Sequence, residues 1–483
     1  QRKGRRDRME IKVYQDTVTA GQVICDTKHE LSVEAEILIP DYLPQVFKIV
    51  KCFVSCVVLQ KQFSAGRLTV EGYLRCVVLY QSEEAASLCR AEHKLPFTKQ
   101  VELSGENTGA AHAWVSGQTE YVNCRAVSGR RVDVRGAFLM NILAMCAAQQ
   151  PVLTALSGEG VEQKTQALQH VEFLCAPEKL CTAQCQILFS AAPDMVLDTQ
   201  CAVAVDEVKL TEGKAVVKGR ARVAVLYRTG PGHDVQQTEC EAPFNEVLDA
   251  PGADEACRAC VSIQPAGCTI AQNEDGEDSA EGYELSATLA LCVRVFRQEE
   301  TMAVCDAFST LQKTVLTKRD VVLDEAFVPC EQAVTAAAEG ELPDAQAKII
   351  TALATALPPE VLEEEGKATL RGRAIVHLLC ENAVGEVDCY DKACEYSLAL
   401  PQASGGVTAL CEAQVEHVSA QTAGGETRAG DIALRIYFAH EGEDVFDIAR
   451  RYASSPQSIV QANALDDDVR LDAARRLLIP CAR

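Results

Sequence analysis

One pattern occurs three times in this chain of 483 residues and constrains its fold more than any other feature. The segments read GRLTVEGYLRCVVLY at 66–80, GKAVVKGRARVAVLY at 213–227 and GKATLRGRAIVHLLC at 366–380. In each, a second glycine lies six residues after the first, at Gly72, Gly219 and Gly372. These glycines lie 147 and 153 residues apart, so the sequence predicts three tandem copies of one domain.

Two further landmarks accompany the glycines. An aromatic residue follows 24 or 25 positions later, at Phe97, Phe244 and Tyr396. A Pro-Asp pair precedes each glycine, at 40–41, 193–194 and 343–344. We expect the landmarks to hold equivalent positions in the copies, with Phe97 and Phe244 as core anchors.

The local sequence predicts strands rather than helices. β-branched runs bounded by glycine are typical of strands, and the first glycine of each pattern suits a hairpin turn with a positive φ. The second suits a bulge or a close backbone approach. Further strands are expected at 131–139 and 284–297, and helical periodicity is expected mainly in the alanine-rich segment 344–357. The fold class predicted is mainly β, with three β-sandwich-like repeats.

The C-terminal segment has a different pattern. Strands are expected at 434–438 and 477–480. Between them, 443–452 has apolar residues at i, i+3, i+4 and i+7, and a second short helix is expected to begin after Ser455. This order predicts a small βααβ unit over 434–483.

Charge narrows the classes of partner. Lys and Arg number 46 against 69 Asp and Glu, a net charge of −23, which argues against nucleic acid or an anionic membrane surface as the main partner. No run of about 18 apolar residues occurs, so no membrane insertion is expected. The basic residues 1–8 are expected to be a disordered leader, with a partner-binding arm as the alternative.

The 23 cysteines are the most unusual feature of the composition. Many alternate with other residues inside apolar runs, where a reduced thiol behaves as a small buried side chain. We therefore expect a reducing compartment and mostly free thiols. The single CxxC, from Cys257 to Cys260 with Cys268 downstream, has no second CxxC or spaced histidine pair to complete a zinc site. No metal and no cofactor is predicted.

Motifs of known catalysts are absent from the sequence. It has no GxxxxGK[ST], no HExxH and no GxSxG, and its eight histidines are scattered. No catalytic residue is predicted, and a hydrolase built on the repeats stays open only because spacing does not exclude a cysteine nucleophile. The lone Trp114 is expected to be a core or rim anchor rather than a platform for sugars.

Two family resemblances extend these predictions. The segment YFAHEGEDVFDIARRY at 437–452, with 463–465 and 477–480, resembles a LysM domain. The repeats resemble the SPOCS domain of sporulation proteins through 37–41, 70–80 and 95–97. Together they resemble the layout of SipL-like spore coat proteins. The domains expected are 9–150, 164–312, a divergent 313–431 and the LysM at 434–483, with 149–163 as a linker.

The SipL resemblance implies assembly rather than catalysis. Such proteins act in the mother-cell cytoplasm at the forespore surface, where they dock the coat by binding the coat-basement morphogenetic ATPase of the SpoIVA type. Other coat proteins are further expected partners. The resemblance implies a non-catalytic scaffold or adaptor.

The LysM resemblance supplies candidate binding residues in a shallow groove. One wall is expected to hold Gly442, Glu443, Asp444 and Val445, and the other Asn463, Ala464 and Leu465. Phe446 falls just outside the apolar stripe of its helix and is expected to be an interface anchor, with a core role as the alternative. Asp444 and Ala474 replace the usual Thr and Gly, and the added rim charge favours a protein over N-acetylglucosamine chains. A peptidoglycan-binding wall protein stays as the alternative function.

Overall fold

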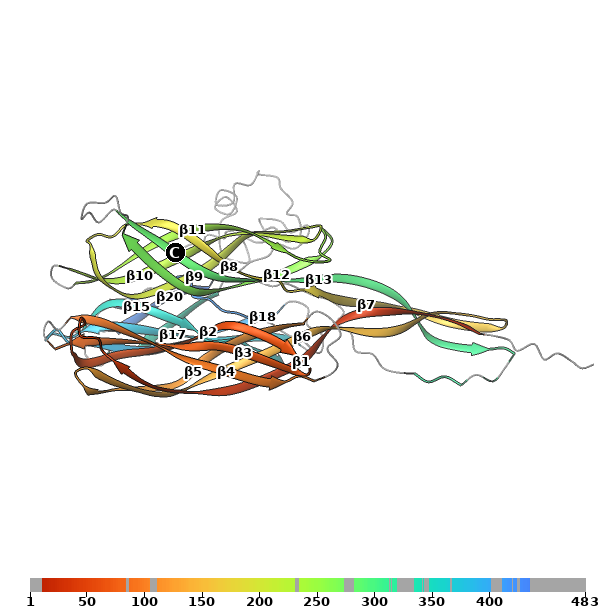
Figure 1. Cartoon of the computed structure of the whole chain (residues 1–483), viewed down its shortest axis with the longest axis horizontal. Helices are drawn as coiled ribbons and strands as arrows, with labels where there is room; N and C mark the ends of the chain where they lie inside the picture. The colour runs from red at the N-terminus through yellow and green to blue at the C-terminus, as the bar shows by residue number, and fades with distance from the viewer. Residues whose placement is uncertain are drawn as a thin grey trace, which may run out of the picture. The chain divides into compact units, whose positions relative to one another are not determined.

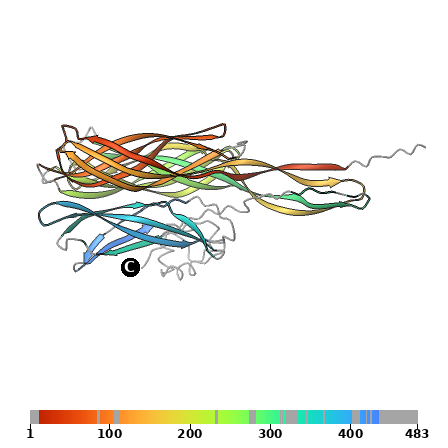
Figure 2. The ribbon, with the colours of Figure 1, turned by 90° about the horizontal axis from the view of Figure 1, so that it is seen from below.

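The computed structural model describes residues 11–83, 87–104, 111–230, 234–272, 282–311, 313, 315–318, 334–340, 342, 347–364, 367–400, 411–418, 420–423 and 426–434. The chain divides into two compact units, Gln1–Phe327 and Val328–Arg483. Every regular element in the described residues is a β-strand, and the strands pair into antiparallel sheets (Figures 1 and 2). The prediction of a mainly β protein is confirmed.

Copy one is a sandwich of two three-stranded sheets with the strand orders β1-β6-β5 and β2-β3-β4. The bounds are β1 (Lys12–Leu38), β2 (Val46–Ser64), β3 (Arg67–Ser82), β4 (Leu88–Glu102), β5 (Ala111–Ser128) and β6 (Arg131–Ser157). Side chains from both sheets meet in one core, to which Leu74, Val78 and Met140 belong. Over 67–76 of β3, buried and less buried residues alternate because successive side chains of a strand point to opposite faces, and from Cys76 to Ser82 every residue is buried.

Copy two repeats this topology within the same unit. Its sheets have the orders β9-β10-β11 and β12-β13-β8, and β7 pairs with the last part of β13 beyond β8. The bounds are β7 (Val161–Cys175), β8 (Glu178–Ile187), β9 (Pro193–Thr211), β10 (Lys214–Thr229), β11 (Val235–Asp249), β12 (Arg258–Gln272) and β13 (Tyr283–Ser309). The strands expected at 131–139 and 284–297 are therefore the first parts of two longer strands, β6 and β13.

Copy three forms the second unit and keeps the same strand order. Its sheets are β14-β20-β19 and β15-β17-β18, with β16 continuing the edge of β17 after β15. The bounds are β14 (Val334–Gly340), β15 (Lys348–Ala356), β16 (Glu360–Glu364), β17 (Lys367–Glu381), β18 (Val387–Ala399), β19 (Ala420–Ala423) and β20 (Glu426–Leu434). The helix expected at 344–357 is wrong over 348–356. Pairing with β17 outweighs the helix propensity of its alanines.

The second glycine of each pattern lies on a central strand opposite an aromatic residue of the next strand. The pairs are Gly72–Phe97, Gly219–Phe244 and Gly372–Tyr396. A Cβ atom at Gly72 would lie 2.2 Å from the carbonyl oxygen of Val57, and one at Gly219 would lie 2.4 Å from that of Ala204. The aromatic ring covers the space that a side chain would need, so only glycine fits this position.

The turns and bulges around the glycines of copies one and two agree with the local expectations, whereas Gly366 of copy three lies outside the described residues. Gly66 and Gly213 close the hairpins with φ angles of 71° and 70°. The β2–β3 register shifts between Val58 and Gln60, directly opposite Gly72. A bulge and a close backbone approach therefore occur together.

The first two Pro-Asp pairs do not hold equivalent positions, and the third, at 343–344, lies outside the described residues. Pro40 lies in the turn between β1 and β2, where its carbonyl accepts a hydrogen bond from Leu43. Pro193 is instead the first residue of β9. The two pairs differ in distance to the following glycine, 32 and 26 residues, and this difference was the signal against them.

The expected linker 149–163 is a hairpin. The strand β6 continues to Ser157, Gly160 turns with a φ of 67°, and β7 begins at Val161. The outer halves of β1, β6, β7 and β13 run on from the sandwiches as an arm (Figures 1 and 2). Val18, Val152, Leu168 and Ala303, one from each strand, form the small core of the arm.

The leader 1–8 and nearly all of the expected LysM lie outside the described residues. Leu434, expected to open the LysM, is the last residue of β20 and pairs with Val334. No helix in the described part of the chain has the length and apolar character needed to cross a membrane.

We predict that Gly72→Ala destabilises copy one by about 1–3 kcal/mol, because the new Cβ meets the carbonyl oxygen of Val57. The measurement is the urea midpoint of the full chain followed by circular dichroism. The control is Gly267→Ala, because a Cβ there meets nothing within 4 Å. Equal midpoints for the two variants would contradict the prediction.

Candidate functional site

A buried polar network in the first unit joins copy one to copy two through Arg228. This residue lies near the end of β10, and only 6% of its surface is exposed. Its Nε donates to the Asp194 carboxylate of β9 at 3.0 Å, and its Nη2 makes a second, shorter contact with the same oxygen. The guanidinium is thereby fixed within copy two.

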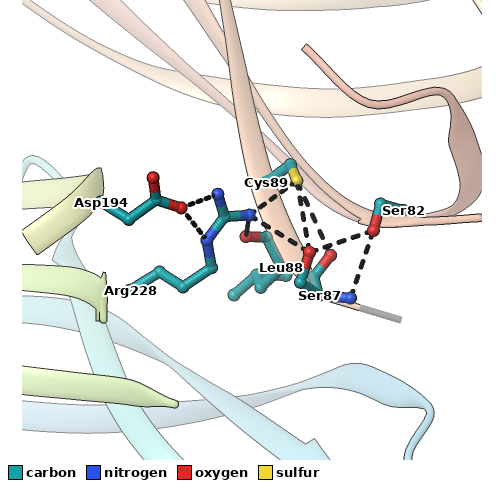
Figure 3. A network of polar contacts seen from close by, with 6 residues as sticks. All are labelled: Ser82, Ser87, Leu88, Cys89, Asp194 and Arg228. Carbon is teal, nitrogen blue, oxygen red and sulfur yellow. Dashed lines mark hydrogen bonds and ion pairs between the residues drawn. The ribbon is translucent and has the colours of Figure 1, made fainter. Parts of the chain in front are cut away.

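The third nitrogen of Arg228 reaches the start of β4 in copy one (Figure 3). Nη1 donates to Ser87 Oγ at 3.2 Å, to the Leu88 carbonyl oxygen at 3.0 Å and to Cys89 Sγ at 3.1 Å. Ser82 Oγ lies 3.0 Å from Ser87 Oγ and accepts from the Ser87 N–H at 3.2 Å. One guanidinium therefore bridges two domains and satisfies polar groups on both.

The charge of Arg228 is maintained despite burial. Burial works to lower the pKa of the guanidinium, but the hydrogen bonds to Asp194 and Cys89 outweigh it and raise that pKa. A planar guanidinium with several donors suits this geometry, whereas a lysine offers a single ammonium. Because these polar groups are buried and paired with one another across the two copies, the network favours one relative orientation of the two domains.

A second polar contact between the copies surrounds Glu178 of β8. Lys61 of β2 forms a close ion pair with its Oε1 and donates to the Ala113 carbonyl oxygen at 3.0 Å. His112 Nδ1 lies 3.3 Å from the same carboxylate, and its Nε2 lies 3.7 Å from Cys292 Sγ of β13. Both copies therefore contribute charged side chains to this contact.

Arg294 of β13 completes the second contact. Its guanidinium stacks on the ring of Trp114 from copy one, with Cζ 4.1 Å from the ring centroid. The residue is 1% exposed, and its Nη1 donates to Cys260 Sγ at 3.7 Å. A desolvated cation over an indole contributes on the order of 2 kcal/mol. Trp114 is thus an anchor between domains, as a core or rim role would require.

The second contact has the donor types of a metal site but the wrong electrostatics. One ligand atom from each of His112, Glu178 and Cys292 lies within 4.8 Å of the others. Burial, and then the charges of Lys61 and Arg294, lower the pKa of His112 to about 3. The field that keeps the imidazole neutral also disfavours a metal cation, so the cluster is a joint between domains.

The described cysteines are free and mostly buried or half-buried. Burial raises the pKa of Cys56 and of Cys201 to about 12, so these thiols are poor nucleophiles. The Cys257 thiol donates a hydrogen bond to the Asp254 carboxylate, whereas the Cys260 sulfur accepts one from Arg294. The two cysteines of the CxxC therefore have different partners.

The structure does not describe the binding residues that the sequence predicted for the LysM groove. The groove residues Gly442, Glu443, Asp444, Val445, Phe446, Asn463, Ala464 and Leu465 lie outside the described residues. Sequence reasoning missed Arg228 and Arg294, although one signal was available. Arg228 stands nine residues after Gly219, whereas Gln81 and Glu381 stand at that distance in the other copies.

We predict that Arg228→Gln loosens the joint by about 1.5–3 kcal/mol, because polar groups on β4 lose a charged donor. Hydrogen exchange of the β4 amides in the full chain should accelerate accordingly. The matched control is Arg222→Gln on the same strand, because Arg222 forms an exposed ion pair with Glu241. Equal exchange rates in the two variants would contradict the role of Arg228.

The depressed pKa of His112 predicts an acid-sensitive joint. In the unfolded chain this pKa returns toward 6.5, so the unfolded state binds the proton more readily. The stabilisation from the neutral imidazole is fully present above pH 6.5 and is lost as the pH falls toward 3. At pH 5 the loss in the free energy of unfolding is about 2 kcal/mol. The urea midpoint should therefore fall more between pH 7.5 and pH 5 in the wild type than in His112→Gln. An equal decrease of the urea midpoint in the wild type and in His112→Gln would contradict this role of His112.

Comparison with known families agrees with the repeat structure. The protein-family model described as SipL, SPOCS domain matches residues 45–127 and 194–271, which span β2 to β5 and β9 to β12. The chain matches no curated protein and no solved structure at a significant level. Arg228 belongs to the second matched segment and its acceptors on β4 to the first. The first two copies of the chain therefore each match the SPOCS domain of SipL.

Proposed function

We propose that this protein is a non-catalytic scaffold or adaptor of spore coat assembly. It would act in the mother-cell cytoplasm at the forespore surface and dock coat components through protein contacts. Its SipL match ties it to sporulation. The partner proposed is the coat-basement morphogenetic ATPase or another coat protein.

The observation that carries this proposal is the joint around Arg228. The buried guanidinium donates hydrogen bonds to acceptors in both domains. Its charge therefore stabilises the contact between the domains. A rigid pair of domains suits a protein that must hold partners at a fixed separation. An enzyme instead needs polar groups directed at a substrate.

The net charge of −23 indicates the kind of surface that the adaptor meets. Acidic proteins repel nucleic acid and anionic lipid, and they are attracted to basic protein surfaces. The proposed partner surface is therefore basic.

A wall-binding protein is the second candidate, and it rests on the LysM resemblance of 437–452. Trp114 lies under Arg294 and offers no open face for a sugar ring. The wall-binding candidate therefore rests on the LysM groove, since the lone tryptophan of the sequence is covered.

We predict that deletion of 435–483 leaves the repeats folded but prevents concentration at the forespore surface. The deletion begins after Leu434 because that residue pairs within β20. Circular dichroism tests the fold, and fluorescence microscopy of sporulating cells tests localisation. Phe446→Ala in the full chain is the finer variant, expected to weaken partner capture by about 2 kcal/mol.

The outcomes separate the two candidate functions. Capture of a coat protein by the full chain and not by the truncated chain supports the adaptor. Micromolar binding of chitin oligomers or peptidoglycan, with normal localisation of the truncated chain, replaces the adaptor with the wall-binding protein.

A further inference from the structure

Copy three carries a polar set across three strands of the sheet β15-β17-β18. His377 on β17 lies between Thr355 on β15 and Asp391 on β18. The distances are 2.8 Å from His377 Nδ1 to Asp391 Oδ1 and 3.2 Å from His377 Nε2 to Thr355 Oγ1. Cys389, two residues before Asp391 and on the same face of β18, places its Sγ 3.8 Å from Asp391 Oδ1.

The fold does not require this set. His377 lies five residues after the glycine of its copy, and the same position holds Val77 in copy one and Ala224 in copy two. Cys389 pairs with Leu379, and the residue at the matching place in copy one is Arg90. Two sandwiches of the same topology therefore form without an imidazole or a thiol here.

We propose that His377, Cys389 and Asp391 bind a zinc ion. Ligand atoms from the three residues lie within 4.8 Å of one another. Imidazole nitrogen, thiolate sulfur and carboxylate oxygen are the donors that zinc takes in proteins, and a thiolate selects against magnesium and calcium.

The distances need little adjustment for such a site. Tetrahedral zinc with ordinary bond lengths sets neighbouring N, O and S donors about 3.4–3.6 Å apart. The two distances to Asp391 Oδ1, 2.8 Å from His377 Nδ1 and 3.8 Å from Cys389 Sγ, bracket that range, and the remaining pair of donors lies within 4.8 Å. Side-chain shifts of about 1 Å therefore bring the three ligands into place. The Asp391 side chain is 45% exposed, which provides a route for the ion and leaves a fourth position for water.

Thr355 supplies the supporting hydrogen bond that a zinc-bound histidine uses. With zinc on Nδ1, the proton of His377 moves to Nε2, and Thr355 Oγ1 accepts it at the observed 3.2 Å. In the cluster around Glu178, by contrast, burial lowers the pKa of the histidine, and the two cations that face it lower it further. The neutral hydroxyl makes the site in copy three the better metal centre.

The test is metal titration of the reduced, chelator-treated full chain with cobalt and then zinc. We expect about one equivalent of cobalt with a thiolate-to-cobalt charge-transfer absorption, which zinc abolishes and excess magnesium does not. His377→Val, which installs the residue of copy one, should fold and lose this absorption. Cys389→Ser should lose it as well, and Thr355→Val should weaken zinc binding about 10–100-fold.

Two controls distinguish this site from the other thiols of the chain. Asp388→Asn changes a neighbour on the opposite face of β18, and Cys305→Ser removes a half-buried thiol of β13. Both should keep wild-type stoichiometry and absorption. The proposal is overturned if the wild type shows no cobalt–thiolate absorption. It is also overturned if Cys389→Ser or His377→Val binds cobalt as the wild type does.

Discussion

The close approach at the second glycine of each copy is the constraint on which the sandwiches depend. At Gly72 and Gly219 the neighbouring strand brings a carbonyl oxygen to within 2.4 Å of where a Cβ would stand. The aromatic residue opposite fills the uncovered space, so the central strand stays packed although it lacks a side chain at that point. Beside each of these two glycines the neighbouring strand bulges, because the pairing skips Leu59 of β2 and Asp206 of β9, while the register on the aromatic side runs on without a shift.

The sequence predicted the fold well where a pattern has a local cause. The hairpin glycines Gly66 and Gly213 and the glycine–aromatic pairs follow from steric demands that each copy meets separately. The errors arose where tertiary pairing overrides local preference, as in β15, whose alanines pack beside β17. The Pro-Asp pairs were wrongly predicted to be equivalent because the dipeptide recurs in the copies, but at different distances from the glycine.

The candidate site was less accessible to sequence reasoning. Arg228 and its acceptors on β4 are about 140 residues apart in the sequence, and nothing local pairs them. The useful signal is a difference between copies, because a residue type that only one copy carries at a position is not demanded by the shared fold. Arg228 in copy two and His377 in copy three are both of this kind, and each lies on the central strand of its sheet.

The arm has a consequence for synthesis of the chain on the ribosome. The strand β1 finds its partner only when β6 is complete, since Lys12 pairs with Ser157, and β7 waits for the end of β13 at Ser309. These long-range pairings make folding slow and leave strand edges unpaired in the nascent chain. Two such chains emerging side by side are therefore exposed to exchange of their arm strands.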